Sequence, residues 1–190
     1  MPFINSYPAD ADPIDVYTAY PEVYEPWMKV QDAVMRGPSP LTAREREIIA
    51  AYTSGLNACR YCHGGHVFMA EALGVEEGLV ASLLEDIDAS DAAAAMKPIL
   101  HYVRKLTLEP AKMTQADADA VFTAGWDGKA LHDAIAVCAM FNFMNRLVDG
   151  LGIQPAQTRS PDRAGEEGIR ALDYSGLVRQ AQKVRGARIG

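Results

Sequence analysis

The chain is poor in cysteine and in positive charge, and it lacks long apolar runs. Its 190 residues include 3 cysteines, 18 Lys and Arg against 25 Asp and Glu, and the net charge is −7. This acidic balance without a basic tract argues against nucleic acid and anionic membrane surfaces as partners. The longest apolar run, residues 134–141, is far shorter than the roughly 20 residues that a membrane helix needs.

The N-terminus lacks the charged and apolar regions of a secretory signal. An odd, small number of cysteines in such a chain does not describe a disulfide scaffold. The hydrophobic fraction of 49% is that of an ordered globular protein. We therefore expect a cytoplasmic protein with a well-formed core.

Alternating runs of β-branched residues are scarce, whereas Ala, Leu, Glu and Met recur at helical spacing. This pattern predicts an all-α fold. The length fits a single domain over residues 1–190, with a core over about 20–155 and a flanking segment at each end. A weak helix is expected in the C-terminal segment at residues 166–172.

The helices are placed by their capping residues and by Gly and Pro. Pro21 opens a helix that presents Val23, Trp27, Val30 and Val34 on one face and ends before Gly37. A helix that Ser90 caps should extend to Leu106 and kink at Pro98. The other expected N-caps are Thr42, Asn57, Thr114 and Asp127.

Two cysteines and a histidine occur at one helical spacing. Cys59, Cys62 and His66 occupy positions i, i+3 and i+7, so they share a face of the predicted helix. Cys59 closely follows the expected N-cap, where free backbone N–H groups favour a thiolate. Glu47, on the preceding helix, can orient the imidazole of His66 and support its cationic form.

Three other readings of this cysteine pair remain open. A lone C-x-x-C can be structural. It can also be part of a zinc site, completed by His66 and a ligand from His63, His101 or His132. A thioredoxin-like motif would follow a strand, and the sequence predicts no strand there.

Glu47 is followed after eleven residues by Cys59-x-x-Cys62 and, after three more residues, by His66. This spacing resembles the signature of the alkylhydroperoxidase D branch of the carboxymuconolactone decarboxylase-like superfamily. Three downstream segments, residues 100–107, 113–117 and 139–147, resemble the same branch. The likeness covers about residues 20–155 and extends to the peroxidase-related subgroup. It implies an alkylhydroperoxidase D-like helical bundle that assembles as a homo-oligomer, a trimer or a hexamer. It also implies an antioxidant oxidoreductase that needs no cofactor or metal beyond a redox-active cysteine pair.

The resemblance assigns roles to individual residues. Cys62 would be oxidised by a hydroperoxide to a sulfenic acid, and Cys59 would donate a proton and then close a disulfide. His66 and Glu47 would form the proton relay. The family pattern has a second histidine directly before the second cysteine, where this chain has Tyr61, whose phenol is a poor proton shuttle at neutral pH. His63 could substitute for it.

We therefore expect a peroxidase that reduces small-molecule hydroperoxides and is restored by a dithiol reductant, such as a lipoyl-bearing or thioredoxin-like protein. One alternative is a lyase resembling carboxymuconolactone decarboxylase, although decarboxylation has no need of a cysteine pair. Another is a non-enzymatic protein that binds zinc or senses redox state.

The remaining polar and sulfur-bearing residues are expected to have structural roles. Cys138 lies in the apolar run and should be an inert core thiol. Asn142, Asn145 and Arg146 interrupt an apolar helix and should tie it to a neighbouring helix or subunit. Packing or surface roles are expected for the remaining candidates, which are Trp27, Trp126, His101 and His132.

Overall fold

The structure is a computed structural model, and it describes residues 1–155, 175–176 and 179. The regular elements in this part of the chain are all helical, as predicted: α1 (Pro13–Ala19), α2 (Pro21–Arg36), α3 (Ala43–Leu56), α4 (Arg60–Ala72), α5 (Leu79–Glu85), α6 (Met96–Leu108), the short 3₁₀ helix η1 (Pro110–Lys112), α7 (Gln115–Thr123) and α8 (Gly128–Gly150). The helix expected at 166–172 lies outside the described residues.

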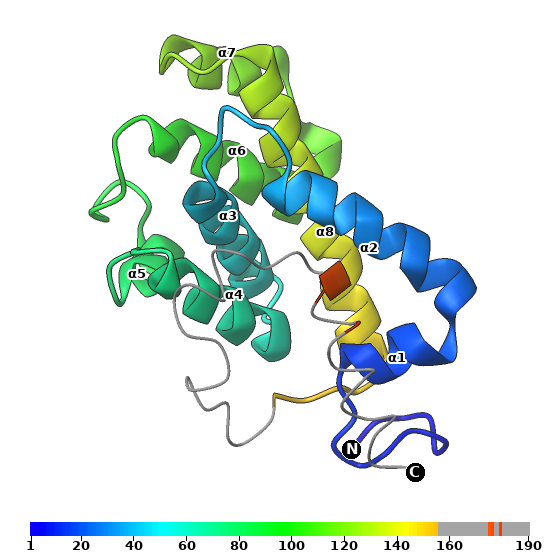
Figure 1. Cartoon of the computed structure of the whole chain (residues 1–190). Coiled ribbons are helices and arrows are strands. Elements are labelled where there is room, and N and C mark those ends of the chain that lie inside the picture. Colours follow the sequence, from blue (N-terminus) through cyan, green and yellow to red (C-terminus); the bar gives the residue numbers. More distant parts are fainter. Residues whose placement is uncertain (156–174, 177–178, 180–190) are drawn as a thin grey trace.

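Helix α3 is the centre of the bundle. It packs most extensively against α4 and also contacts α8, α6 and α5. Figure 1 shows α3 and α4 side by side, with α2 running along α8 on one side of them and α5 on the other. Every residue from 46 to 54 is buried, so α3 carries its polar groups, Glu47 included, into the interior. The residues that pack against this part of α3 must therefore supply partners for its buried polar groups.

Side-chain N-caps begin four of the described α-helices, α1, α3, α7 and α8. Thr42 and Thr114 each form a reciprocal capping box with the acidic residue three positions later, and the Asp127 carboxylate accepts from Ala130 N. These three predicted N-caps are confirmed. Helix α1 was not predicted, although it has the same signature: the capping box of Asp12 and Asp15, with Pro13 in the first turn.

Predictions for two of the helices are wrong. Helix α6 begins at Met96 with Ala95 as its N-cap, so Ser90 does not cap it. Pro98 therefore lies in the first turn, where a missing N–H costs nothing and no kink is needed. The buried face of α2 is formed by Tyr24, Met28, Gln31 and Met35. It does not include Val23 and Val30, which are 53% and 48% exposed, because the larger Tyr and Met side chains remove more apolar surface from water.

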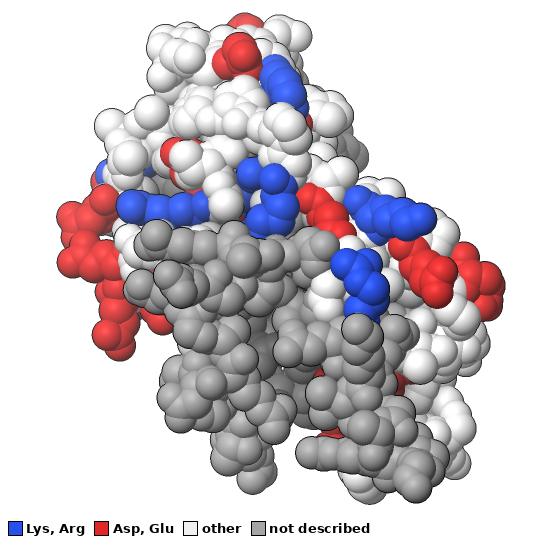
Figure 2. Space-filling model, viewed as in Figure 1, with Lys and Arg blue, Asp and Glu red and all other residues white. Residues whose placement is uncertain are grey.

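The surface agrees with the acidic composition. On the face in Figure 2, acidic side chains gather over α2 and near α5, and Lys and Arg side chains lie between these two groups. None of the described helices is both long enough and apolar enough to cross a membrane.

Candidate active site

The two cysteines lie at a sharp junction between α3 and α4. Asn57 ends α3 as its C-cap, and Ala58 follows with a left-handed φ of 55°. Cys59 itself is the N-cap of α4, which begins at Arg60. The predicted N-cap at Asn57 was thus two residues early, because a tight left-handed turn separates the helices. Cys59 therefore lies at the helix N-terminus, where backbone N–H groups are free.

Both cysteine side chains are buried. Cys59 is fully buried and Cys62 is 6% exposed. The Cys62 thiol and backbone N–H lie against the Cys59 sulfur and lower the pKa of Cys59, although burial opposes this shift. The same interaction, together with burial, raises the pKa of the Cys62 thiol. The thiolate form is therefore favoured at Cys59 over Cys62, as we predicted from the position of Cys59 at a helix N-terminus.

The predicted Glu47–His66 pair is present. The Glu47 carboxylate is completely buried, and its Oε2 lies 2.6 Å from His66 Nδ1. Burial alone would raise the pKa of Glu47, but the His66 charge and hydrogen bond, together with the Arg36 guanidinium, lower it. An ionised carboxylate accepts from Nδ1–H, so Nε2 is the nitrogen of His66 that can accept a proton. The edge of the imidazole contacts Phe141 of α8, with ring centroids 4.2 Å apart.

The two supporting candidates lie on different sides of α4. His63 Nδ1 is 2.9 Å from the carbonyl of Ala51, so this ring is held against the backbone of α3. Tyr61 is half-buried and packs against the core. The supporting roles of Tyr61 and His63 in proton transfer stay predictions.

Helix α8 completes the surroundings of the cysteines. Asn145 is 1% exposed, donates to Ser54 Oγ at 3.0 Å and accepts from Asn57 Nδ2 at 2.9 Å. Asn57 Nδ2 also donates to Asn142 Oδ1 at 3.1 Å. The prediction that these asparagines tie α8 to a neighbouring helix is confirmed, and the helix is α3. Asn145 also lowers the pKa of Cys62, and thus opposes the rise that Cys59 and burial cause.

Three further residues near the site were not singled out from the sequence. Arg36 NH2 lies 2.5 Å from Glu47 Oε1. Asp149, one turn beyond Asn145, interacts with Cys59 and raises its pKa, opposing Cys62. Tyr17 of α1 is buried beside Cys62; burial, and then the Cys62 charge, raises the pKa of its phenol. A helix-terminal Arg, an exposed Asp and a Tyr are common surface and core residues, so no local sequence signal distinguished them.

The other candidates lie apart from this site. Cys138 is fully buried, contacts Thr107 Oγ1 at 3.3 Å, and has a pKa raised by burial, as expected for a core thiol. His101 and His132 are on the surface, beside Asp88 and Asp133. The described residues contain no group of three or more His, Cys, Asp or Glu side chains arranged to hold a metal ion.

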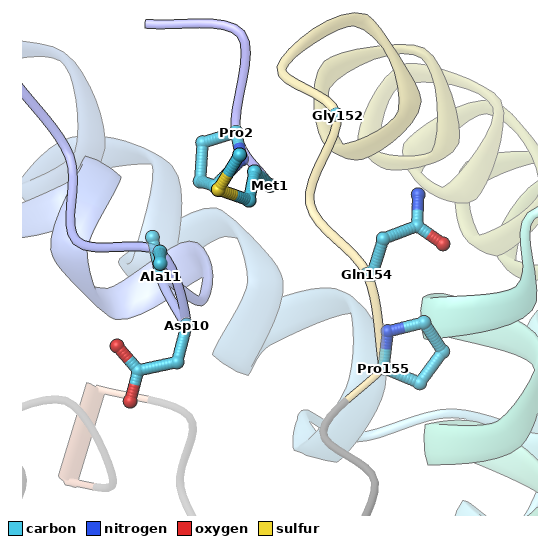
Figure 3. A pocket seen from close by; sticks show the side chains of 8 residues that line it. Met1, Pro2, Asp10, Ala11, Gly152, Gln154 and Pro155 are labelled. Carbon is cyan, nitrogen blue, oxygen red and sulfur yellow. The ribbon is translucent and has the colours of Figure 1, made fainter. Parts of the chain in front are cut away.

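A cavity of about 190 Å³ lies elsewhere, between the N-terminal segment and the residues that follow α8. Figure 3 shows Met1 and Pro2 on one side of it and Gln154 and Pro155 on the other. Its walls come from the segments that flank the bundle, whereas the cysteine pair lies at the α3–α4 junction.

The fold and this arrangement define a class of helical protein with a buried dithiol at a helix N-terminus and an ionised carboxylate–imidazole pair beside it. Residues 21–105 match the carboxymuconolactone decarboxylase family model, and this segment holds Glu47, both cysteines and His66. This match agrees with the predicted resemblance to the carboxymuconolactone decarboxylase-like superfamily.

Solved structures show the same fold. A peroxidase-related protein from Silicibacter sp. TM1040 is 24% identical with a TM-score of 0.71, covering 76% of this chain and 75% of its own. An alkylhydroperoxidase AhpD core protein from Ralstonia eutropha JMP134 is 22% identical with a TM-score of 0.70, covering 75% of both chains. The debrominase Bmp8 in complex with 2,3,4-tribromopyrrole is 16% identical with a TM-score of 0.67, covering 76% of both chains. A search of curated proteins finds no match.

Proposed function

We propose that the protein is a thiol-dependent hydroperoxide reductase that uses Cys59 and Cys62 as its redox pair. One arrangement carries the proposal: two buried cysteines lie at the N-terminus of α4, one as its N-cap and one in its first turn, on the helix that also carries His66, which is hydrogen-bonded to Glu47. A thiolate is the nucleophile toward a peroxide, and a neighbouring thiol converts the resulting sulfenic acid to a disulfide.

In the first step a proton moves from one cysteine to the other. Cys62 passes its proton to the Cys59 thiolate and attacks the terminal oxygen of the hydroperoxide, so that the O–O bond breaks and Cys62 becomes a sulfenic acid. Cys59 then protonates the leaving alkoxide, which departs as the alcohol. Cys59 is again a thiolate at the end of this step, and Cys62 has been oxidised by two electrons.

Disulfide closure follows within the same helical turn. The Cys59 thiolate attacks the Cys62 sulfur, the S–O bond breaks, and the hydroxide that leaves takes a proton from His66 Nε2. Glu47 at Nδ1 stabilises the imidazolium that supplies this proton. A dithiol reductant then transfers two electrons and two protons and is itself oxidised to a disulfide. One proton returns to Cys62 and the other to His66, while Cys59 is again a thiolate.

The surroundings of Cys62 favour an organic hydroperoxide. Tyr17 and Phe141 are buried aromatic residues beside Cys62 and His66 respectively. Such rings favour the apolar part of an alkyl hydroperoxide over a small polar oxidant. Because Cys62 is only 6% exposed, substrate and reductant need a local opening of the structure to reach its sulfur.

Peroxide consumption with dithiothreitol as the reductant tests the proposal. We expect turnover of cumene hydroperoxide by the wild-type protein, a loss of at least about 100-fold in Cys62→Ser and in Cys59→Ser, and no loss in Cys138→Ala, which removes a core thiol outside the pair. Mass spectrometry after limited peroxide should show a reversible loss of two hydrogens mapped to Cys59 and Cys62. Equal rates in all four proteins would rule the proposal out.

The alternatives have distinct outcomes in companion measurements. Decarboxylation of a lactone substrate that survives the double Cys→Ser replacement would instead identify a lyase. About one zinc per chain in the purified protein would identify a zinc-binding protein.

A further inference from the structure

The buried carboxylate of Glu47 has a second charged partner. Arg36 is the last residue of α2, and its NH2 lies 2.5 Å from Glu47 Oε1 while His66 Nδ1 lies 2.6 Å from Oε2. The Arg36 side chain is only 15% exposed. Each oxygen of the carboxylate therefore has its own cation or donor, and the three residues come from three different helices.

A second arginine fixes the end of α2 from which Arg36 projects. Arg46 of α3 is buried, and its NH1 donates to the carbonyls of Val34 and Gly37, each at 2.9 Å. Arg36 NH1 also donates to the carbonyl of Met35 at 2.9 Å. The last turn of α2 is thus held in place by Arg46, and the other guanidinium nitrogen of Arg36 is aimed at Glu47.

We propose that Arg36 is a positioning residue for the Glu47–His66 relay: it holds Oε1 and supplies the permanent charge that keeps the buried carboxylate ionised, so that Oε2 remains the acceptor for His66 Nδ1–H. This inference rests on the proposed function for its effect on turnover. Arg suits the role because its guanidinium stays charged at every physiological pH, whereas an imidazole changes charge during the reaction.

In this arrangement Arg36 keeps a positive charge beside Glu47 throughout the proton transfer by His66. When His66 is neutral, Arg36 still balances the Glu47 carboxylate, which would otherwise be an isolated charge in the interior. The titratable and charged groups that face Glu47 and lower its pKa are His66 from α4 and Arg36 from α2. Without Arg36, Glu47 should take up a proton, and the fixed tautomer of His66 would be lost.

Arg36→Met and Arg36→Lys separate this role from a packing role. In Arg36→Met we expect the acid limb of the pH profile of peroxide turnover to move up by at least one unit, with a loss of at least about tenfold at pH 7. Arg36→Lys keeps the charge, so it should keep the acid limb close to its wild-type position and retain most of the wild-type rate at pH 7. Arg46→Met is the matched control, because it removes a buried arginine of α3 that binds the same end of α2; it should lower Tm without moving the acid limb.

A second readout does not depend on turnover. In histidine labelled with ¹⁵N, the His66 Nδ1–H bound to Glu47 should give a downfield proton signal in the wild type and in Arg36→Lys, and lose it in Arg36→Met. If Arg36→Met does not fold, Arg36→Gln replaces it, with the same expected direction. An unchanged signal and an unchanged acid limb in a folded Met or Gln variant would overturn the inference. A lost signal in a protein without peroxide activity would retain the role of Arg36 and reject the proposed function.

Discussion

Asn145 shows how much a single buried polar side chain contributes here. It donates to Ser54 and accepts from Asn57, so it joins α8 to the end of α3 directly before the cysteine turn. Ser54 is also fully buried. Removing the Asn145 amide leaves two polar groups without this partner next to the redox pair, and buried groups that lose a partner bear the full cost of desolvation.

We therefore expect Asn145→Ala to destabilise the protein by about 1–3 kcal/mol, measured by urea unfolding. Gln115→Ala removes an amide whose hydrogen bond to Asp119 is exposed, so it should change the stability by less than about 0.5 kcal/mol. Equal losses in the two variants would show that the Asn145 network does not hold the α3–α8 contact.

Among the helices, α7 depends on one acidic residue both for its N-terminal cap and for its contact with α6. Asp117 closes the capping box with Thr114 and also pairs with Lys105 of α6, at 2.7 Å from Oδ2. The Lys105 hydrogen bond first, and then those of Thr114, lower the pKa of Asp117 to about 2. One carboxylate therefore both starts this helix and docks it on its neighbour.

The sign of the pH dependence follows from this shift. The pKa in the folded state lies below the unfolded value of about 3.9, so the stabilisation is fully present above pH 4 and is lost as the pH falls toward 2. We expect the wild type to lose more stability than Asp117→Asn between pH 5 and pH 2.5 in urea unfolding followed by circular dichroism. Parallel losses in the two proteins would assign the acid sensitivity to other carboxylates.

For the whole molecule, apolar side chains on α2 and α8 remain exposed. Val23 and Val30 face solvent, and so does Phe143, which is 45% exposed and packs its ring on Trp27 at 4.5 Å between centroids. Apolar groups that gather on a surface mark interaction sites more often than scattered ones do. The homo-oligomer that the family resemblance implies would bury them.

We expect Val30→Glu to shift the protein toward smaller species in sedimentation velocity, because a carboxylate in an apolar interface is costly. Phe122→Glu is the control, since Phe122 is comparably exposed but lies on α7. A dissociating effect of the Phe122 variant alone would place the interface on α7 instead.

The sequence by itself determined the helical class, most helix starts and the shared face of Cys59, Cys62 and His66. These features depend on neighbours within a few residues: a capping box spans three positions, and a helical face repeats every three or four. The Glu47–His66 pair was also predictable, through a motif whose two halves lie on consecutive helices.

Only the tertiary structure decided what surrounds that motif. Arg36 reaches Glu47 because the C-terminal end of α2 lies against α3. Asn145 and Asp149 reach the cysteines because α8 packs across the α3–α4 junction. Tertiary packing likewise decided which face of α2 is buried. That face carries the larger Tyr and Met side chains and leaves Val23 and Val30 exposed. Contacts between distant helices depend on how buried faces fit together, and no pattern within one helix records that fit.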